Sequence, residues 1–447
     1  MSKKAHNRHD MSPAHAGLPE ASEELLESVR QRGIDPERLS ILKLGQKASF
    51  LLKPPYAAWL WRLILGLGLW NVSLSLRAGI VPISEFQLAI VQLVTGLIIL
   101  QVACEALITA TERLAARLQW NHYVAGTVAE MLSTTPELVV IAFVVPVSPV
   151  VAFVITLITI YNNALVFSLY SFFLPKDKRG KFLMPTPITE AGTQILIGGG
   201  AMGLVLGLVM LTLDSQSLGK NSFAPVDLIF TSAILLIIFV VYSYKLVTSY
   251  AREEKHVREH LGMSEEDIEQ RMDLIYEHVE KTPTPLIVSL FLIGIAGAVI
   301  GGEQISEFAQ AMIEDIEINV ILTAIILAGF AGMSEYVILW KSHKKQEYGI
   351  ALANAFGGIT QVMFLVLPFT LLSIAFYQLY GNPAHPELPL AFSMSNIFLL
   401  LFLFPTFYTL SSLLEEDHTL GILDTVIMSS IFLFLIVLLA SYGAIEL

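Results

Sequence analysis

The chain contains 447 residues, of which 54% are hydrophobic and only 15% are charged. Soluble domains use about 45–50% apolar and about 25% charged residues, so this composition excludes an ordinary soluble protein. The formal net charge is −12, and the sequence lacks the basic footprint that nucleic-acid-binding proteins show. We therefore expect no nucleic-acid partner.

The first part of the chain is polar, and we expect it to form a cytoplasmic N-terminal tail at residues 1–55. The segment ASEELLESVRQRGIDPERL within it has the pattern of a short amphipathic helix. No long apolar run follows Lys3 and Lys4, so the tail does not resemble a secretory signal peptide.

Apolar runs of about 20 residues follow the tail, and this length crosses the hydrocarbon core of a bilayer. They predict an all-α integral membrane protein with about eleven transmembrane helices, for which the lipid bilayer is the first expected partner. The predicted spans lie near residues 56–77, 87–110, 122–145, 149–174, 189–212, 226–248, 284–302, 318–341, 348–378, 391–412 and 420–442.

The lysines and arginines in the loops predict the orientation, because basic residues are retained on the cytoplasmic side. The basic loops fall on the side of the N-terminal tail, near residues 113–117, 176–181, 252–281 and 341–345. The opposite loops contain little beyond Arg77 and Lys220. We therefore expect the N-terminus in the cytoplasm and the C-terminus on the opposite side.

The longest polar connection separates two groups of five predicted spans, which suggests a duplication. Because five is an odd number, the second copy must be inverted. Inverted repeats that meet in broken helices at mid-membrane are typical of secondary transporters, although duplication also occurs in membrane proteins that transport nothing. After the tail, the expected units are an extra transmembrane helix at 56–77, a first five-helix repeat at 87–248, a charged cytoplasmic loop at 249–283 and a second five-helix repeat at 284–442.

Two glutamates stand inside apolar runs at matching places of the predicted repeats. Glu137 follows Pro136 in LSTTPELVV, and Glu335 lies in AGFAGMSEYV. A carboxylate at membrane depth costs about 2.5–3.5 kcal/mol on insertion scales, so it usually faces a cavity, pairs or binds an ion. Proline denies a helix one backbone hydrogen bond and frees a carbonyl. We expect the two glutamates to form the centre of a cation site; the alternative is a simple hydrogen bond to a neighbouring helix.

Neutral oxygens are available on the helix that follows each glutamate. The candidates are Thr159, Asn162 and Asn163 in the first repeat, and Asn354 and Gln361 in the second. Thr159 and Asn163 are four residues apart and so share one helix face. Carboxylate and neutral oxygens together are the ligands that Ca²⁺ and similar hard cations prefer. Amides in membrane helices also link helices to one another, and both interpretations stay open for each residue.

These motifs resemble the calcium/cation antiporter superfamily over roughly residues 85–445. The second half, with AGMSE ending at Glu335 and GGITQ ending at Gln361, is similar to the cation/proton exchanger branch, whose repeat pairs a G-N-A-x-E helix with a G-S-x-x-Q/N helix. The first half, LSTTPE followed by ITIYNNALVF, is similar to the G-T-S-L-P-E pattern of the sodium/calcium exchangers. The extra helix and the acidic central loop also fit an eleven-helix cation/proton exchanger.

The resemblance implies that Glu137 and Glu335 are the central cation ligands. The other ligand positions that it implies are Ser133, Thr134, Thr159, Asn163 and Gln361.

The second copy departs from the sodium exchangers at their hydroxyl positions. Ala331, Gly332 and Gly358 stand there, and Ser334 replaces the proline before the glutamate. The resemblance therefore favours protons over sodium as the coupling ion.

Glu130 lies seven residues before Glu137, on roughly the same helical face and nearer the cytoplasm. Ala328 stands at the corresponding position of the second repeat. Glu130 is either a proton acceptor or entry ligand, or a structural carboxylate that a partner satisfies. Together with Glu137 and Glu335 it completes the proton-linked candidates.

The sequence favours a secondary-active antiporter that exchanges Ca²⁺ or a similar cation for protons by alternating access. A sodium-driven exchanger of the same superfamily is the first alternative, and a non-transporting membrane receptor or scaffold is the second. We do not expect an enzyme, because the predicted spans contain no nucleophile paired with a base and no cluster of metal ligands. No cofactor is expected. Ca²⁺ is the expected cargo, with Mg²⁺, Mn²⁺ and K⁺ left open because carboxylates and amides suit hard cations in general.

Overall fold

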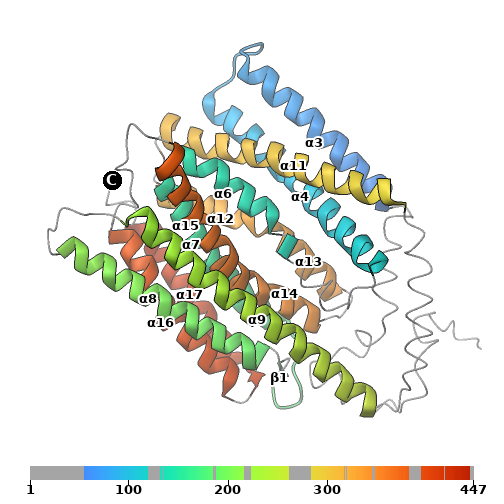
Figure 1. Cartoon of the computed structure of the whole chain (residues 1–447), viewed down its shortest axis with the longest axis vertical. Helices are drawn as coiled ribbons and strands as arrows, with labels where there is room; N and C mark the ends of the chain where they lie inside the picture. The colour runs from blue at the N-terminus through green and yellow to red at the C-terminus, as the bar shows by residue number, and fades with distance from the viewer. Residues whose placement is uncertain are drawn as a thin grey trace, which may run out of the picture.

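The computed structural model shows a chain built almost wholly from helices (Figure 1). Among the described residues, nine helices are long and apolar enough to cross a membrane, and two shorter apolar helices accompany them. These segments fall on the predicted spans, so the predicted fold class, an all-α integral membrane protein, is confirmed. The structure describes residues 55–118, 131–132, 134–184, 188–215, 223–260, 283–316, 318, 320–344, 348–381, 394–416 and 418–442.

Six α-helices make up the described part of the first half. They are α3 (Pro55–Arg77), α4 (Glu85–Arg117), α6 (Thr135–Val147), α7 (Pro149–Tyr170), α8 (Thr193–Ser215) and α9 (Pro225–His260). A 3-10 turn, η3 (Ser171–Phe173), ends α7, and a π turn, η4 (Ile188–Gly192), leads into α8.

The helices of the second half contain more π turns. They are α11 (Thr284–Gln310), α12 (Val320–Ala331), α13 (Met333–Lys344), α14 (Tyr348–Gln361), α15 (Leu367–Phe376), α16 (Met394–Glu415) and α17 (Ile422–Tyr442). The π turns are η5 (Ala311–Asp315), η6 (Val362–Val366) and η7 (Tyr377–Gly381).

A proline and a hydroxyl make the tight connection between α6 and α7. Pro149 stands in the first turn of α7, where its missing N–H would have had no partner in any case. Ser148 caps the helix, because its hydroxyl accepts a hydrogen bond from the backbone N–H of Val151 at 3.3 Å. The chain therefore begins α7 one residue after α6 ends, and the two helices are in contact.

The structure adds detail to two predicted segments. The predicted span 318–341 is interrupted, because α12 ends at Ala331 and α13 begins at Met333, with Gly332 between them. The apolar part of α9 ends at Ser249, where the predicted loop 249–283 begins, and the helix continues past it to His260; the bounds of the loop stay a prediction. The sequence after Tyr250 alternates basic and acidic residues, a pattern that is typical of a solvated helix. Residues 261–282 of that loop lie outside the described residues, as do the predicted tail, Ser133 and Glu130.

Helices of the two halves pack in reciprocal pairs. α4 lies along α11, and α8 lies along α16. α7 of the first half contacts α17 of the second, and the reciprocal contact joins α9 to α15. α7 also contacts α12, and the reciprocal contact joins α6 to α15. Figure 1 shows α3, α4 and α11 together on one flank and α8 and α16 on the other. An inverted duplication produces this exchange of partners; the repeat boundaries at 87–248 and 284–442 stay a prediction.

The α4–α11 pair crosses on two glycines. A Cβ on Gly96 would lie 3.0 Å from the carbonyl oxygen of Gly301, and a Cβ on Gly301 would lie 3.1 Å from that of Gly96. Membrane helices approach closely where small residues face one another. α3 is attached to the same flank, because Arg62 donates two hydrogen bonds to the Glu105 carboxylate at 2.9 and 2.8 Å.

Two short strands join the halves at one end of the molecule. β1 (Phe182–Leu183) pairs antiparallel with β2 (Thr419–Leu420), with Phe182 opposite Leu420. β1 belongs to the connection between α7 and α8, and β2 to the connection between α16 and α17. Both connections therefore lie on the same face of the molecule, as the predicted alternation of spans requires.

Candidate functional site

Glu137 and Glu335 occupy the same position in two interrupted helices. Each stands in the first turn of a helix that begins after a break, Glu137 in α6 and Glu335 in α13. Both are buried, with 8% and 9% of their surface exposed. The unpaired N–H groups and the dipole at a helix N-terminus favour negative charge. Both carboxylates are therefore placed where the backbone partly compensates their charge.

Pro136 has a different role from the predicted one. It stands in the first turn of α6, where a proline interrupts no backbone hydrogen bond. Just before it, the Thr134 hydroxyl donates to the carbonyl of Met131 at 2.7 Å, while the Thr134 carbonyl accepts from the N–H of Leu138 at 3.1 Å. The break before Glu137 is thus the start of a new helix, and the Thr134 hydroxyl oxygen can only accept from further partners.

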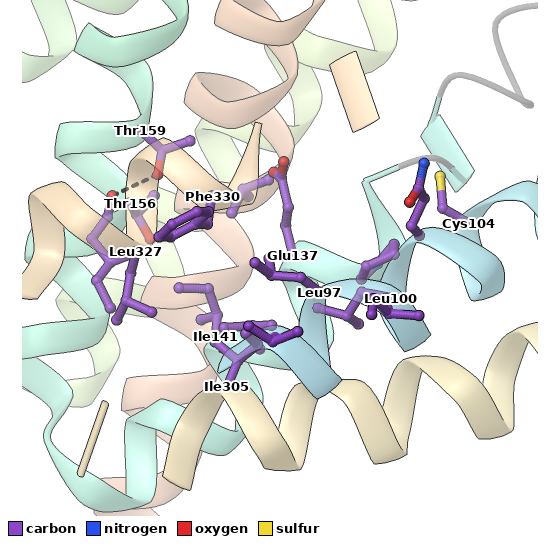
Figure 2. A pocket seen from close by; sticks show the side chains of 17 residues that line it. Leu97, Leu100, Cys104, Glu137, Ile141, Thr156, Thr159, Ile305, Leu327 and Phe330 are labelled. Carbon is purple, nitrogen blue, oxygen red and sulfur yellow. Dashed lines mark hydrogen bonds between the residues drawn. The ribbon is translucent and has the colours of Figure 1, made fainter. Parts of the chain in front are cut away.

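A cavity of about 290 Å³ lies beside Glu137 (Figure 2). Thr159 from α7 also lines it, and its hydroxyl donates to the carbonyl of Ile155 at 2.8 Å, so its oxygen can accept or ligate. The Oε2 atom of Glu137 is buried and has no hydrogen-bond partner within the described residues. A buried polar atom without a partner is costly. Glu137 therefore lines the cavity and has a buried carboxylate oxygen without a hydrogen-bond partner in the described part of the chain.

Glu335 is packed against the backbone of α14. A Cβ on Gly358 would lie 2.7 Å from both the Cδ and the Oε1 of Glu335, so the carboxylate occupies the space that any other residue at 358 would fill. The amide nitrogen of Asn354, one turn earlier on α14, donates to the Glu335 carbonyl at 3.4 Å. Gly358, which the sequence presents as a lost hydroxyl, is in the structure the cradle of the second carboxylate.

Asn162 and Asn163 have unequal surroundings on α7. The Asn162 amide nitrogen donates to the Ala328 carbonyl at 3.3 Å and to the Tyr336 hydroxyl, so it links α7 to α12 and α13 across the break at Gly332. Asn163 is buried, and neither its Oδ1 nor its Nδ2 has a partner within the described residues. Asn162 therefore acts as a helix link through its nitrogen, whereas the whole Asn163 amide remains available.

Tyr336 is a further polar residue beside Glu335, and its hydroxyl accepts a hydrogen bond from the amide nitrogen of Asn162. Tyr336 is the residue that sequence reasoning missed, although a signal was present: it follows Glu335 directly and stands four residues after Gly332. A Cβ on Gly332 would lie 2.8 Å from the Tyr336 hydroxyl, so this glycine leaves room for the phenol.

The predicted site residues divide into groups. Glu137 and Thr159 share the cavity, while Glu335 and Asn354 meet at α14. Gln361 is buried at the end of α14, directly before η6, and does not line the cavity. The described part of the chain contains no group of three or more His, Cys, Asp or Glu side chains that could hold a metal ion. A cation held here would therefore need neutral oxygens besides the carboxylates.

Comparisons with known proteins agree with this architecture. Residues 286–441 match the family described as sodium/calcium exchanger protein. The match covers most of the second predicted repeat, and there it confirms the resemblance to the calcium/cation antiporter superfamily. No curated protein sequence matches the chain.

Solved structures extend the likeness to most of the chain. The H⁺/Ca²⁺ exchanger CAX has a TM-score of 0.53 at 13% identity, over 87% of this chain and 96% of that one. YfkE has a TM-score of 0.51 at 14% identity, over 84% and 98%. The sodium-calcium exchanger NCX_Mj has a TM-score of 0.45 at 15% identity, over 78% and 98%. The first two show that the chain has their fold.

Proposed function

We propose that this multi-pass membrane protein is a secondary-active cation antiporter, because residues 286–441 match the family described as sodium/calcium exchanger protein and the chain has the fold of an H⁺/Ca²⁺ exchanger. It exchanges Ca²⁺, or a similar hard cation, for protons by alternating access. The N-terminus lies in the cytoplasm and the C-terminus on the opposite side. Labelling a cysteine placed at Lys178, in a Cys104→Ala background, tests this orientation, because a reagent should reach it only from the side of the tail.

One observation carries the proposal: two buried carboxylates stand at equivalent positions of two interrupted helices. Interrupted helices at mid-membrane are where secondary transporters place their substrate and coupling-ion sites. Glu137 and Glu335 would supply the charge for a dication, and Asn163, Thr159, Gln361, Asn354 and Asn162 supply neutral oxygens. Thr134 and Ser133 complete the candidate ligand set next to the break before Glu137.

The same pair explains exchange in physical terms. Two ionised carboxylates far from water are costly to leave without a counter-charge. A bound dication neutralises them, and so do two protons, but the empty and charged site is unfavourable. The loaded forms can therefore reorient while the empty form resists reorientation, which couples one ion to the other. Glu130 is the remaining proton-linked candidate on the cytoplasmic side.

The surroundings of Glu335 favour protons over sodium as the counter-ion. A sodium site needs additional oxygen ligands, and Gly358 cannot be exchanged for a hydroxyl residue without a collision with the Glu335 carboxylate. A sodium-driven exchanger is the second candidate, because Thr134 and Thr159 supply hydroxyls in the first half. A receptor or scaffold that transports nothing would bind no cation between the two glutamates.

The test is flux into vesicles that contain the purified full-length protein. A pH gradient alone should drive Ca²⁺ movement and a Na⁺ gradient alone should not; the reverse result selects the sodium-driven exchanger. Glu137→Gln and Glu335→Gln should each abolish exchange and the stabilisation of the fold by Ca²⁺. Glu303→Gln, at an exposed position of α11, is the matched control and should behave as the unchanged protein. Full flux in both glutamine variants would refute the proposal.

A further inference from the structure

The wall of the cavity beside Glu137 is mostly hydrocarbon. Leu97 from α4, Ile305 from α11, and Leu327 and Phe330 from α12 line it. A hard dication such as Ca²⁺ takes six to eight oxygen ligands, and this wall offers few. In Figure 2 the carboxyl group of Glu137 is drawn between the Phe330 ring and Cys104, at the edge of a largely apolar space. The cavity therefore offers fewer oxygen ligands than a bare dication needs.

The polar atoms of the wall mostly accept hydrogen bonds. The Thr159 hydroxyl already donates to the Ile155 carbonyl at 2.8 Å, and the Thr156 hydroxyl lies 2.9 Å from both the Ala152 carbonyl and the Thr370 hydroxyl. The Oε2 atom of Glu137 has no partner within the described residues. Gln101 is the lining residue whose amide both donates and accepts. A ligand that fits must donate hydrogen bonds and carry positive charge at its polar end.

Size and access suit a small organic ligand. The cavity of about 290 Å³ is at the lower end of the roughly 300–1,000 Å³ found for small-molecule sites. Val94 lines the cavity and leaves 43% of its surface exposed, so the cavity comes close to the outer surface of α4 at an apolar side chain. The ring of Phe330 offers a face to an aromatic body or to a cation.

We propose that this cavity binds a lipophilic primary ammonium ion, whose ammonium group pairs with Glu137 while its hydrocarbon body lies against Leu97, Ile305, Leu327 and Phe330. Such an ion competes with the transported cation for the Glu137 carboxylate. Binding requires the charge and shape of the cavity and no transport, so it goes beyond the proposed function and survives the failure of that proposal.

The experiment uses the purified full-length chain in lipid nanodiscs, with no ion gradient. The probe is 2-phenylethylammonium at neutral pH; 2-phenylethanol is the neutral analogue and phenylacetate the anionic one. A ligand that binds only the folded state raises the unfolding temperature in proportion to the logarithm of its concentration. We expect a saturable rise with the ammonium ion alone, and a rightward shift of its titration when Ca²⁺ is added.

Two variants separate binding from partition into lipid. Glu137→Gln should weaken the apparent affinity for 2-phenylethylammonium by about tenfold or more, because it removes a charge-assisted hydrogen bond. Val94→Phe should weaken it by filling the cavity at an exposed position, and this holds even if Glu137→Gln fails to fold. Glu303→Gln should leave it unchanged. Three results would each overturn the inference. They are equal stabilisation by 2-phenylethanol, an unchanged affinity in the Glu137→Gln or Val94→Phe variant, and a lack of stabilisation below ~10 mM 2-phenylethylammonium, which is a weaker affinity than useful ligands show.

Discussion

At the scale of single residues, the position of the Glu335 carboxylate of α13 depends on Gly358 of α14. The carboxylate lies where a Cβ at 358 would stand, with 2.7 Å to its Oε1 and Cδ. Side-chain positions in packed interiors respond to the addition of a single carbon, because there is no spare volume to absorb it. The Glu335 carboxylate can therefore adopt this orientation only because Gly358 has no Cβ atom.

This dependence predicts the effect of Gly358→Ala. The new methyl group should displace the Glu335 carboxylate and lower the affinity for the cation by about 10–100-fold, the usual cost of disturbing a residue that orients a metal ligand. The measurement is the Ca²⁺ concentration that half-maximally stabilises the purified protein against thermal unfolding. Gly198→Ala is the matched control, because a Cβ there meets nothing within 4 Å. Equal Ca²⁺ affinity in both variants would show that Glu335 does not hold the cation.

At the scale of elements, α3, α4 and α11 form one flank whose contacts are made by glycines and by polar links. Gly96 and Gly301 bring the backbones of α4 and α11 together. The Ser73 hydroxyl of α3 donates to the Gln304 side chain of α11 at 2.7 Å, and about three turns away along α3 Arg62 forms an ion pair with Glu105 of α4. Small residues and polar side chains are the main means of joining helices in lipid, since burial from water supplies no drive there.

The crossing predicts that Gly301→Leu destabilises the fold. A side chain at 301 would meet the Leu100 Cγ at 2.7 Å and the Gly96 carbonyl oxygen at 3.1 Å. Overpacking of this kind typically costs ~1–3 kcal/mol, so the thermal unfolding temperature should fall by several degrees. Gly68→Leu on α3 serves as the control, because a Cβ there meets nothing within 4 Å. The same unfolding temperature for both variants would mean that α4 and α11 are further apart than described.

At the scale of the whole molecule, the two halves exchange partners across the centre, and each contributes one carboxylate on an interrupted helix. Metal affinity depends on pH wherever the ligands must lose protons before they bind. On the proposed function, protons and the cation compete for the same pair, Glu137 and Glu335. Acid would protonate the pair and weaken cation binding, while alkali would strengthen it.

The prediction is that Ca²⁺-dependent stabilisation of the purified protein increases as pH rises from about 6 to about 8, by up to about tenfold in affinity for each proton displaced per pH unit. Thermal unfolding at constant ionic strength measures it. Glu335→Gln removes one of the two titrating ligands and should reduce the slope. A Ca²⁺ affinity that stays constant across this pH range would exclude proton competition at the site and would favour sodium as the counter-ion.

The sequence by itself determined the class of the protein and the places of its spans, and it predicted the two residues at the centre of the candidate site. These features are local, because the length of an apolar run can be counted in the sequence and the cost of a carboxylate in lipid does not depend on which helix lies beside it. The sequence did not reveal how far α9 continues as a helix beyond Ser249, because a solvated helix and a charged loop have similar composition.

Only the tertiary structure decided which atoms surround those two residues. The break at Gly332, the helix start at Pro136, the cradle at Gly358 and the link from Asn162 to Tyr336 all depend on backbones that lie side by side although they are distant in the chain. Gly358 shows the reason most clearly. In the sequence it reads as a missing ligand, and its function appears only when another helix places a carboxylate in the space that it leaves.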